Sequence, residues 1–332
     1  MTAETAAQEL LTVKDLRVSA TRRESQDLHV VDGASFSIAP GERAALVGES
    51  GSGKSVTCFS VMGLLAQNLR VSGGSIRWRG NDLATAKREE IRRLRGPEIA
   101  MIYQEPLTSL NPLMTIGYQL KEAARRSKVG RREILEMLDR VGFADPRRIM
   151  GQRPHELSGG MRQRVMIAMA LIGQPKLLLA DEPTTALDVT IQSQVLKLMY
   201  DLSYEMGTAV LIVSHDLSVV RKLSDTIHVM YAGQVVESGP TDSVLSQPRH
   251  PYTRALLSSA PRLGDTRERL ESIPGIVPTP DQWDAGCRFR SRCPLATERC
   301  AETPPVDVVA DRSSACWHVD QLLAEQKEAT PL

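Results

Sequence analysis

The sequence Gly48-Glu49-Ser50-Gly51-Ser52-Gly53-Lys54-Ser55 matches the pattern G-x-x-x-x-G-K-[ST], known as the P-loop. It follows the apolar run Arg43–Val47, which predicts a buried strand. Glycines let the backbone curl so that successive N–H groups point at phosphate oxygens, and a helix starting near Lys54 adds its positive dipole end. We expect Lys54 to contact the β- and γ-phosphates and Ser55 to bind Mg²⁺. A glycine-rich turn without function is the alternative, and the preceding strand argues against it.

A second apolar run ends in two carboxylates. Leu177–Ala180 predicts a strand, and Asp181 and Glu182 follow it directly. A single aspartate at a strand end is a weak signal, but the P-loop strengthens it, because a bound Mg-nucleotide needs a carboxylate near its metal, usually acting through water. We therefore expect Asp181 to contribute to Mg²⁺ binding and Glu182 to polarise the attacking water as general base.

The composition is that of a globular protein. The chain has 332 residues, with 42% hydrophobic and 24% charged residues, and a formal net charge of +1. This near-neutral balance does not point to nucleic acid as a partner. No apolar run approaches the roughly 18–20 residues that span a bilayer, and the N-terminus shows no secretory pattern. We expect any link to a membrane to run through other chains.

The order of apolar patterns predicts the architecture. Strand-like runs alternate with helical spacing, which favours a mostly parallel α/β sheet covered by helices. Residues 105–157 have helical spacing with many charges, and proline becomes frequent from about Pro240. We expect a nucleotide-binding domain over residues 1–240, with a helical subdomain at about 105–160. A loop-rich C-terminal extension is expected over residues 241–332.

A third motif narrows the family. Leu157-Ser158-Gly159-Gly160-Met161-Arg162-Gln163-Arg164 closely resembles the LSGGQ signature of ABC ATPases. A serine and two glycines at a helix start expose N–H groups to an anion. The resemblance implies a P-loop NTPase fold of the RecA-like ABC type, with antiparallel β and helical subdomains. It also implies that Ser158, Gly159 and Gly160 cap the γ-phosphate of ATP bound to an opposite subunit, so that two cassettes dimerise around ATP.

Further positions match this family in order. Gln104 resembles the Q-loop glutamine, which senses Mg²⁺ and water beside a permease-docking surface near Gln104–Pro112. Thr185-Ala186-Leu187-Asp188 resembles the D-loop, and His215 resembles the switch histidine that contacts the γ-phosphate. The resemblance thus adds Gln104 and His215 to the catalytic residues Glu182 and Lys54, and Asp188 to the nucleotide contacts.

Two departures from the family pattern stand out. Met161 replaces the usual glutamine of the signature, which leaves Ser158 and Gly160 in place. The early strand carries no ring at Val18-Ser19-Ala20, where an aromatic residue would stack on adenine. His29 and Phe36 are possible substitutes, and no adenine contact is assigned.

The C-terminal extension resembles one branch of the family. His250-Pro251-Tyr252-Thr253-Arg254-Ala255-Leu256-Leu257 and Ile273-Pro274-Gly275 resemble the oligopeptide/dipeptide/nickel importer ATPases, above all the dipeptide-type D subunit. The resemblance implies import of peptides by a complex of two different ATPases, which would form a heterodimer, with two permeases and an extracytoplasmic binding protein. The chain would then lie on the cytoplasmic face of the membrane. A nickel or other small-solute importer is the alternative, and a soluble non-transport ABC ATPase is a more distant one.

Four cysteines crowd the last fifth of the chain. Cys287, Cys293, Cys300 and Cys316 have the spacing C-x5-C-x6-C-x15-C, which is neither a zinc ribbon nor a ferredoxin run. Four thiolates could hold a [4Fe–4S] cluster, as in several members of the resembling family, or zinc, or remain reduced thiols. We expect the [4Fe–4S] cluster in a structural role. His318 is an alternative ligand, and its interpretation as a surface histidine is favoured. Cys58 is expected to be a small core residue.

Overall fold

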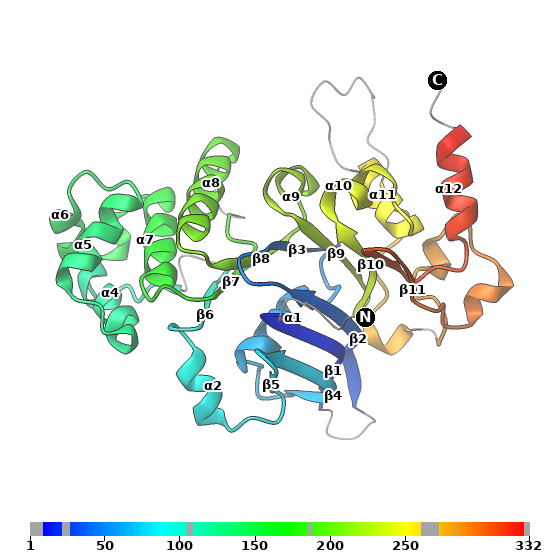
Figure 1. Ribbon diagram of the computed structural model, residues 1–332, viewed down its shortest axis with the longest axis horizontal. Coiled ribbons are helices and arrows are strands. Elements are labelled where there is room, and N and C mark those ends of the chain that lie inside the picture. The colour runs from blue at the N-terminus through cyan, green and yellow to red at the C-terminus, as the bar shows by residue number, and fades with distance from the viewer. Residues whose placement is uncertain are drawn as a thin grey trace, which may run out of the picture. The chain divides into compact units, whose positions relative to one another are not determined.

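Strands and helices alternate along most of the chain in the computed structural model, as the sequence predicts (Figure 1). The structure describes residues 9–21, 27–104, 109–184, 188–259, 272–283 and 285–328. Two compact units can be distinguished. We call Ile38–Arg43 with Thr85–Val213 the helix-rich unit, and Glu9–Ser37 with Ala44–Ala84 and Ser214–Leu332 the P-loop unit. Each unit is described by itself.

Three parallel strands form the sheet of the helix-rich unit. Strand β7 (Leu177–Asp181) lies between β6 (Ile99–Ile102) and β8 (Ala209–Ser214), and all five of its residues are buried. Parallel strands that are covered on both faces carry continuous apolar runs rather than alternating ones, which explains the sequence Leu177–Ala180. Because all three run in one direction, their carboxyl ends lie at the same edge.

Helices make up the rest of this unit. Figure 1 shows α4, α5, α6 and α7 gathered in one group, and these helices contact one another. Helix α5 is amphipathic and buries Ile134, Met137 and Leu138 on one face. The Asp145 side chain caps α6 by accepting from the backbone N–H of Arg148. The helices are α2 (Arg88–Leu94), α4 (Ile116–Ala124), α5 (Arg131–Arg140), α6 (Pro146–Gly151), α7 (Gly159–Leu171) and α8 (Val189–Glu205).

The P-loop unit contains a four-stranded sheet in the order β2-β1-β4-β5. Strands β1 and β4 pair in antiparallel register from Leu11↔Trp78 to Ala20↔Leu69, with an irregularity around Arg17. The four strands are β1 (Leu11–Ala20), β2 (Leu28–Ile38), β4 (Leu69–Trp78) and β5 (Asn81–Asp82). This sheet matches the antiparallel β subdomain that the resemblance implies.

A second set of strands positions the P-loop. Strand β3 (Arg43–Val47) runs parallel to β9 (Thr226–Tyr231), and β10 (Gln234–Pro240) pairs antiparallel with β9. Helix α1 (Lys54–Met62) starts at the end of the P-loop. The remaining helices of the unit are α9 (Leu217–Leu223), α10 (Thr241–Ser246), α11 (Pro251–Ser259) and α12 (Val319–Glu328).

The C-terminal extension is less irregular than its proline content predicts. Two short strands, β12 (Arg312–Ser314) and β11 (Asp307–Val309), continue the sheet from β10. Every residue of β11 is exposed, so no hydrophobic alternation marks it in the sequence. Short 3₁₀ turns at Pro280–Gln282, Arg290–Arg292 and Glu298–Ala301 form much of the rest.

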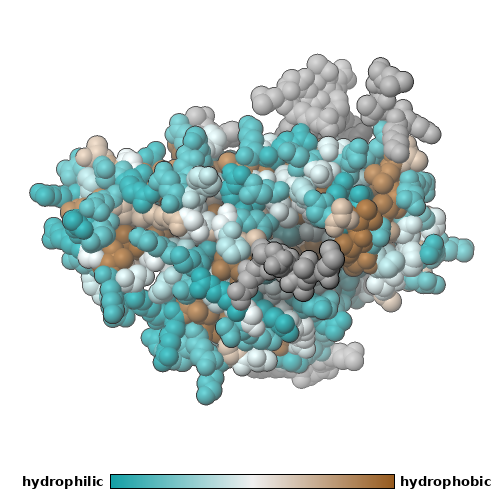
Figure 2. Space-filling view, viewed as in Figure 1, coloured by the Kyte–Doolittle hydropathy of each residue, from teal (hydrophilic) through white to brown (hydrophobic). Residues whose placement is uncertain are grey.

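Hydrophilic side chains cover most of the face seen in Figure 2, with smaller apolar areas between them. Among the described residues, no helix is long and apolar enough to cross a bilayer.

Strand β7 should carry much of the stability of the helix-rich unit. Leu178 is fully buried in this strand, so Leu178→Ala removes apolar contacts and leaves a cavity, at a cost of about 2–5 kcal/mol. We expect a clear fall in the urea midpoint followed by circular dichroism. Leu113→Ala is the control, because 82% of Leu113 is exposed and the change should cost less than about 0.5 kcal/mol. Equal midpoints for the two variants would contradict this assignment of the core.

Candidate nucleotide site

The P-loop depends on glycines with unusual backbone angles. Gly48, Gly51 and Gly53 have φ values of 153°, 81° and 100°, which side chains rarely allow. A Cβ atom on Gly48 would lie 2.1 Å from the carbonyl oxygen of Met230. A glycine is therefore required where the loop passes strand β9. Gly233 N–H donates to the Ser52 carbonyl at 2.9 Å and holds the loop from its other side.

Lys54 is buried at the centre of this loop, with 5% of its surface exposed. Its ammonium group donates to the carbonyl oxygens of Gly48 and Glu49, both at 2.8 Å. Lys54 is also the first residue of α1, and Ser55 follows it, so both lie at the positive end of the helix dipole. The structure thus gathers Gly48, Glu49, Ser50, Gly51, Ser52, Gly53, Lys54 and Ser55 into one turn around a buried cation. Such a turn suits an anion of high charge.

The carboxylates lie at the carboxyl end of β7. Asp181 ends this strand and is 3% exposed, whereas Glu182 has a positive φ of 43°. The Glu182 N–H donates to the carbonyl of Val213 at 3.1 Å. Gln104 follows the neighbouring strand β6, and its Nε2 donates to Glu182 Oε2 at 3.1 Å. Two of the predicted catalytic residues therefore contact each other directly, because their parallel strands end at the same edge.

The signature motif opens helix α7. The Ser158 hydroxyl accepts from the backbone N–H of Met161 at 3.4 Å, and Gly159 and Gly160 form the first helical turn. This is the capped N-terminus that the sequence predicts. The substitution at Met161 leaves that geometry intact.

Gln163 links this helix to the carboxylate turn. Its side chain is fully buried, and its amide donates to the carbonyl of Pro183, the residue after Glu182. The sequence alone indicates no role for Gln163, although this residue lies within the signature. Only the fold shows that α7 and the turn after β7 share a hydrogen bond.

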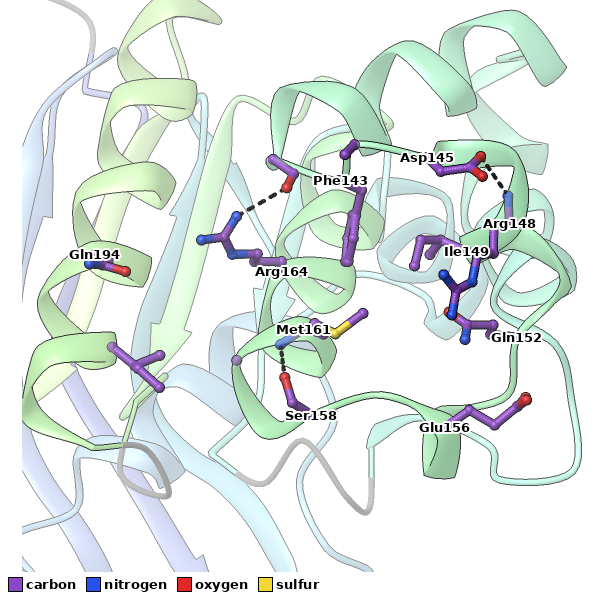
Figure 3. A pocket seen from close by; sticks show the side chains of 14 residues that line it. Phe143, Asp145, Arg148, Ile149, Gln152, Glu156, Ser158, Met161, Arg164 and Gln194 are labelled. Carbon is purple, nitrogen blue, oxygen red and sulfur yellow. Dashed lines mark hydrogen bonds between the residues drawn. The ribbon is translucent and has the colours of Figure 1, made fainter.

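A cavity of about 610 Å³ lies beside the signature (Figure 3). Ser158, Met161 and Arg164 of α7 line it together with Asp145 and Gln152. The Arg164 guanidinium donates to the backbone carbonyl of Val141 at 3.0 Å, and this hydrogen bond fixes its position. The cavity makes the N-terminus of α7 accessible from this side.

The remaining predicted contacts are distributed over both units. Asp188 is exposed and precedes α8 in the helix-rich unit, where Thr185, Ala186 and Leu187 lie outside the described residues. Residues 105–108 of the expected docking surface also lie outside them. His215 is exposed and follows β8, in the P-loop unit. The role of each of these residues stays a prediction.

Neither candidate ring for adenine gains support as a stacking platform. Phe36 is 7% exposed and packs on His228, with ring centroids 5.1 Å apart. His29 is exposed and shares a 2.9 Å hydrogen bond with the Ser19 hydroxyl. Phe36 therefore belongs to the core, which leaves only His29 accessible.

The four C-terminal cysteines line one small cavity. Cys287, Cys293, Cys300 and Cys316 surround it together with His318, whose Nε2 lies 3.6 Å from Cys300 Sγ. Burial raises the pKa of Cys293 to about 11 and that of Cys316 to about 12, so these thiols stay protonated near neutral pH. Within the described part of the chain, no three His, Cys, Asp or Glu side chains are placed to hold a metal ion.

The expected [4Fe–4S] cluster is therefore not supported by the geometry. The sulfurs share a cavity, but their side chains are not arranged as a ligand set. Cys58, in contrast, is fully buried in α1, as predicted for a core residue.

Comparison with known proteins agrees with this geometry. The model of the family described as "ABC transporter" matches residues 31–185. The model "Oligopeptide/dipeptide transporter, C-terminal region" matches residues 236–300. The oligopeptide transport ATP-binding protein AppD of Bacillus subtilis is 46% identical over 96% of this chain and 99% of its own. The chain belongs to the ABC transporter family of ATP-binding proteins.

Other relatives and solved structures point the same way. A putative peptide import ATP-binding protein of Brucella melitensis is 51% identical over 96% of this ABC protein and 99% of its own length. A dimeric ATP-binding cassette in a post-hydrolysis state with ADP and Pi has a TM-score of 0.61 at 26% identity. It covers 70% of this chain and 98% of its own. CbiO1 of Clostridium perfringens also has a TM-score of 0.61. This match covers 72% of the present chain and 92% of the CbiO1 chain. The predicted ABC cassette fold and ATPase class are confirmed.

Glu182→Gln tests the proposed base. The amide keeps the size of the side chain but accepts no proton from water, so turnover should fall at least about a hundredfold while ATP binding persists. Phosphate release and fluorescent-nucleotide binding measure the two effects. Glu136→Gln should change neither, since Glu136 belongs to α5 and its side chain is 60% exposed. Normal hydrolysis by Glu182→Gln would remove Glu182 from this role.

Proposed function

We propose that this ABC protein hydrolyses ATP to drive the import of peptides through membrane permeases. The observation that carries the proposal is the combination, in one chain, of an ABC cassette and the oligopeptide/dipeptide C-terminal region. Relatives at 45–51% identity are named as peptide import or oligopeptide transport ATP-binding proteins and match nearly the whole chain.

We assign the roles of the residues from the family resemblance, together with the geometry that each unit shows by itself. In the P-loop unit, Lys54 would neutralise the β- and γ-phosphates, and Ser55 would bind their Mg²⁺. In the helix-rich unit, Asp181 would bind the same ion through water. Glu182 would then take a proton from the attacking water, with Gln104 holding the carboxylate in place.

ATP would also join two cassettes in the proposed mechanism. The N-terminus of α7 at Ser158 would contact the γ-phosphate held by the P-loop of a second ATPase subunit. His215 and Asp188 would add contacts across the same nucleotide. Because such contacts exist only when ATP is bound, hydrolysis would release the pair and reset the transporter.

Exposed apolar side chains that follow Gln104 in the sequence support docking to permeases. Leu113 is 82% exposed, Tyr118 51% and Met114 39%, in the segment that follows Gln104. Exposed apolar groups of this kind are typical of protein interfaces. We infer that two permeases hold the chain on the cytoplasmic face of the membrane, with a second ATPase and an extracytoplasmic binding protein in the complex.

Purification of the tagged chain from gently solubilised membranes tests this proposal. We expect two permeases, a second ATPase and a peptide-loaded binding protein to co-purify, as identified by mass spectrometry. A nickel chelate or another small solute in the binding protein would replace peptide as the cargo. Recovery only from the soluble fraction, with ribosomes or nucleic acid, would overturn the transport function and leave the ATPase chemistry intact.

We also propose that the four C-terminal cysteines bind a structural [4Fe–4S] cluster. The proposal starts from the family resemblance, and it uses the observation that the four residues line one cavity although they are separated along the chain. Side-chain rotation would be needed to bring the sulfurs into a ligand set, since they do not form one as they lie. No step of ATP hydrolysis requires electron transfer, so the cluster would stabilise the extension.

Cys293→Ser tests the cluster. A hydroxyl is a poor ligand for iron, so the variant should lose bound iron and visible absorption after anaerobic purification while still binding ATP. Cys58→Ala is the control and should keep its iron, because Cys58 lies in α1 and not at the cavity. An iron-free wild-type protein prepared anaerobically would contradict the proposal, and zinc in its place would reassign the site.

A further inference from the structure

The C-terminal extension contacts the P-loop through a buried arginine. Arg292 Nη1 and Nη2 donate to the two carboxylate oxygens of Glu49 at 2.8 and 2.9 Å. Only 4% of the Arg292 side chain is exposed, against 28% of Glu49. Two parallel N–H···O bonds fix both the position and the orientation of a carboxylate. The second residue of the P-loop is therefore held by a side chain 243 positions away in the sequence.

Arg292 is itself held in a single orientation. Its Nε donates to the carbonyl of Pro274 at 2.7 Å, and Nη1 also lies 3.3 Å from the Tyr231 hydroxyl. The guanidinium lies over the rings of Tyr231 and Phe289, at 5.8 and 5.9 Å from their centroids. Burial opposes the charge of Arg292, but its hydrogen bonds to Glu49 and Tyr231 outweigh this and raise its pKa. The guanidinium remains charged at any physiological pH.

A second group of the extension contacts the same P-loop residue. The Glu49 backbone N–H donates to the Tyr252 hydroxyl at 2.8 Å. The Tyr252 ring is fully buried and lies 4.5 Å from that of Tyr231 and 5.4 Å from that of Phe289. Tyr231 directly follows Met230, the residue whose carbonyl oxygen requires a glycine at 48. This aromatic group thus fixes the backbone at the entrance to the loop.

Glu49 is consequently held at three points. Its N–H is bound by Tyr252, its carboxylate by Arg292, and its carbonyl by the ammonium group of Lys54 at 2.8 Å. A shift of Glu49 would therefore also move Lys54. The charge matters as well, because an unpaired carboxylate in a loop that receives a triphosphate would repel it.

We propose that Arg292 is a positioning residue of the nucleotide site, which pairs the charge of Glu49 and fixes the P-loop with the help of Tyr252. The C-terminal extension is by this contact part of the ATP-binding apparatus. The inference rests on the proposed ATP site but not on the transported solute. Phe289 and Cys293 line the cysteine cavity, and Cys293 directly follows Arg292 in the sequence. The residues that form this cavity therefore also support the contact between Arg292 and Glu49.

Arg292→Gln in the full-length chain tests the role. We expect the Kd and KM for ATP to rise about tenfold, with kcat at saturating ATP changed less than twofold, because the loss acts on binding rather than on the water-activating carboxylate. Arg292→Lys should lie between wild type and Arg292→Gln, since it keeps the charge and loses the paired hydrogen bonds. Fluorescent-nucleotide titration and phosphate release measure these quantities.

A second substitution separates charge pairing from a general loss of structure. Glu49→Gln in the Arg292→Gln background removes the unpaired carboxylate, so it should restore the Kd to within about threefold of wild type. Tyr252→Phe keeps the ring and deletes only the hydroxyl, and we expect a two- to fivefold rise in Kd. This variant also tests the contact if Arg292→Gln does not fold.

Control variants distinguish a wrong assignment of Arg292 from a wrong assignment of the ATP site. Arg254→Gln breaks another ion pair of the extension, to Glu325 at 2.7 Å, and should leave the Kd unchanged. Lys54→Ala should abolish binding, and a wild-type protein that binds no ATP would overturn the proposed ATP site itself. With a wild type that binds ATP, an unchanged Kd in Arg292→Gln and Tyr252→Phe would overturn the positioning role. So would a double variant no better than Arg292→Gln.

Discussion

The close approach of the P-loop to strand β9 is the constraint on which the nucleotide site depends. A Cβ atom at position 48 would lie 2.1 Å from the Met230 carbonyl oxygen, so the loop passes β9 only with a glycine there. This passage orders the turn that encloses the Lys54 ammonium group and starts helix α1. The cation and the helix dipole then act on the same small volume, where a triphosphate gains most from both.

In the helix-rich unit, the parallel direction of the strands brings the predicted site residues together. Strands β6 and β7 are parallel neighbours, so Gln104 and Glu182 emerge at one edge and share a hydrogen bond. Gln163 then joins the signature helix to the turn after Glu182. Gln104, the proposed base Glu182 and the start of α7 are thus connected through hydrogen bonds within one unit.

The C-terminal extension carries the cysteines and also contacts the P-loop. Tyr252 and Arg292 contact the P-loop at Glu49, which is the basis for assigning this segment a part in nucleotide binding. The cysteine cavity lies directly behind these residues. Whatever stabilises the cavity will also stabilise the contact, because Phe289 belongs to both.

The sequence by itself determined the features that are built from residues adjacent in the chain. These are the P-loop, the carboxylates after β7 and the capped start of α7. Each consists of a few consecutive positions, so its pattern survives without the fold, and the family resemblance supplied Gln104, Asp188 and His215. The short strand β11 escaped prediction because exposed residues carry no hydrophobic period. Only the tertiary structure decided that Arg292 pairs with Glu49, that Gln163 bonds Pro183 and that the cysteine sulfurs share a cavity without forming a ligand set. These relations join residues far apart in the chain, and it is packing that decides which of many possible partners meet.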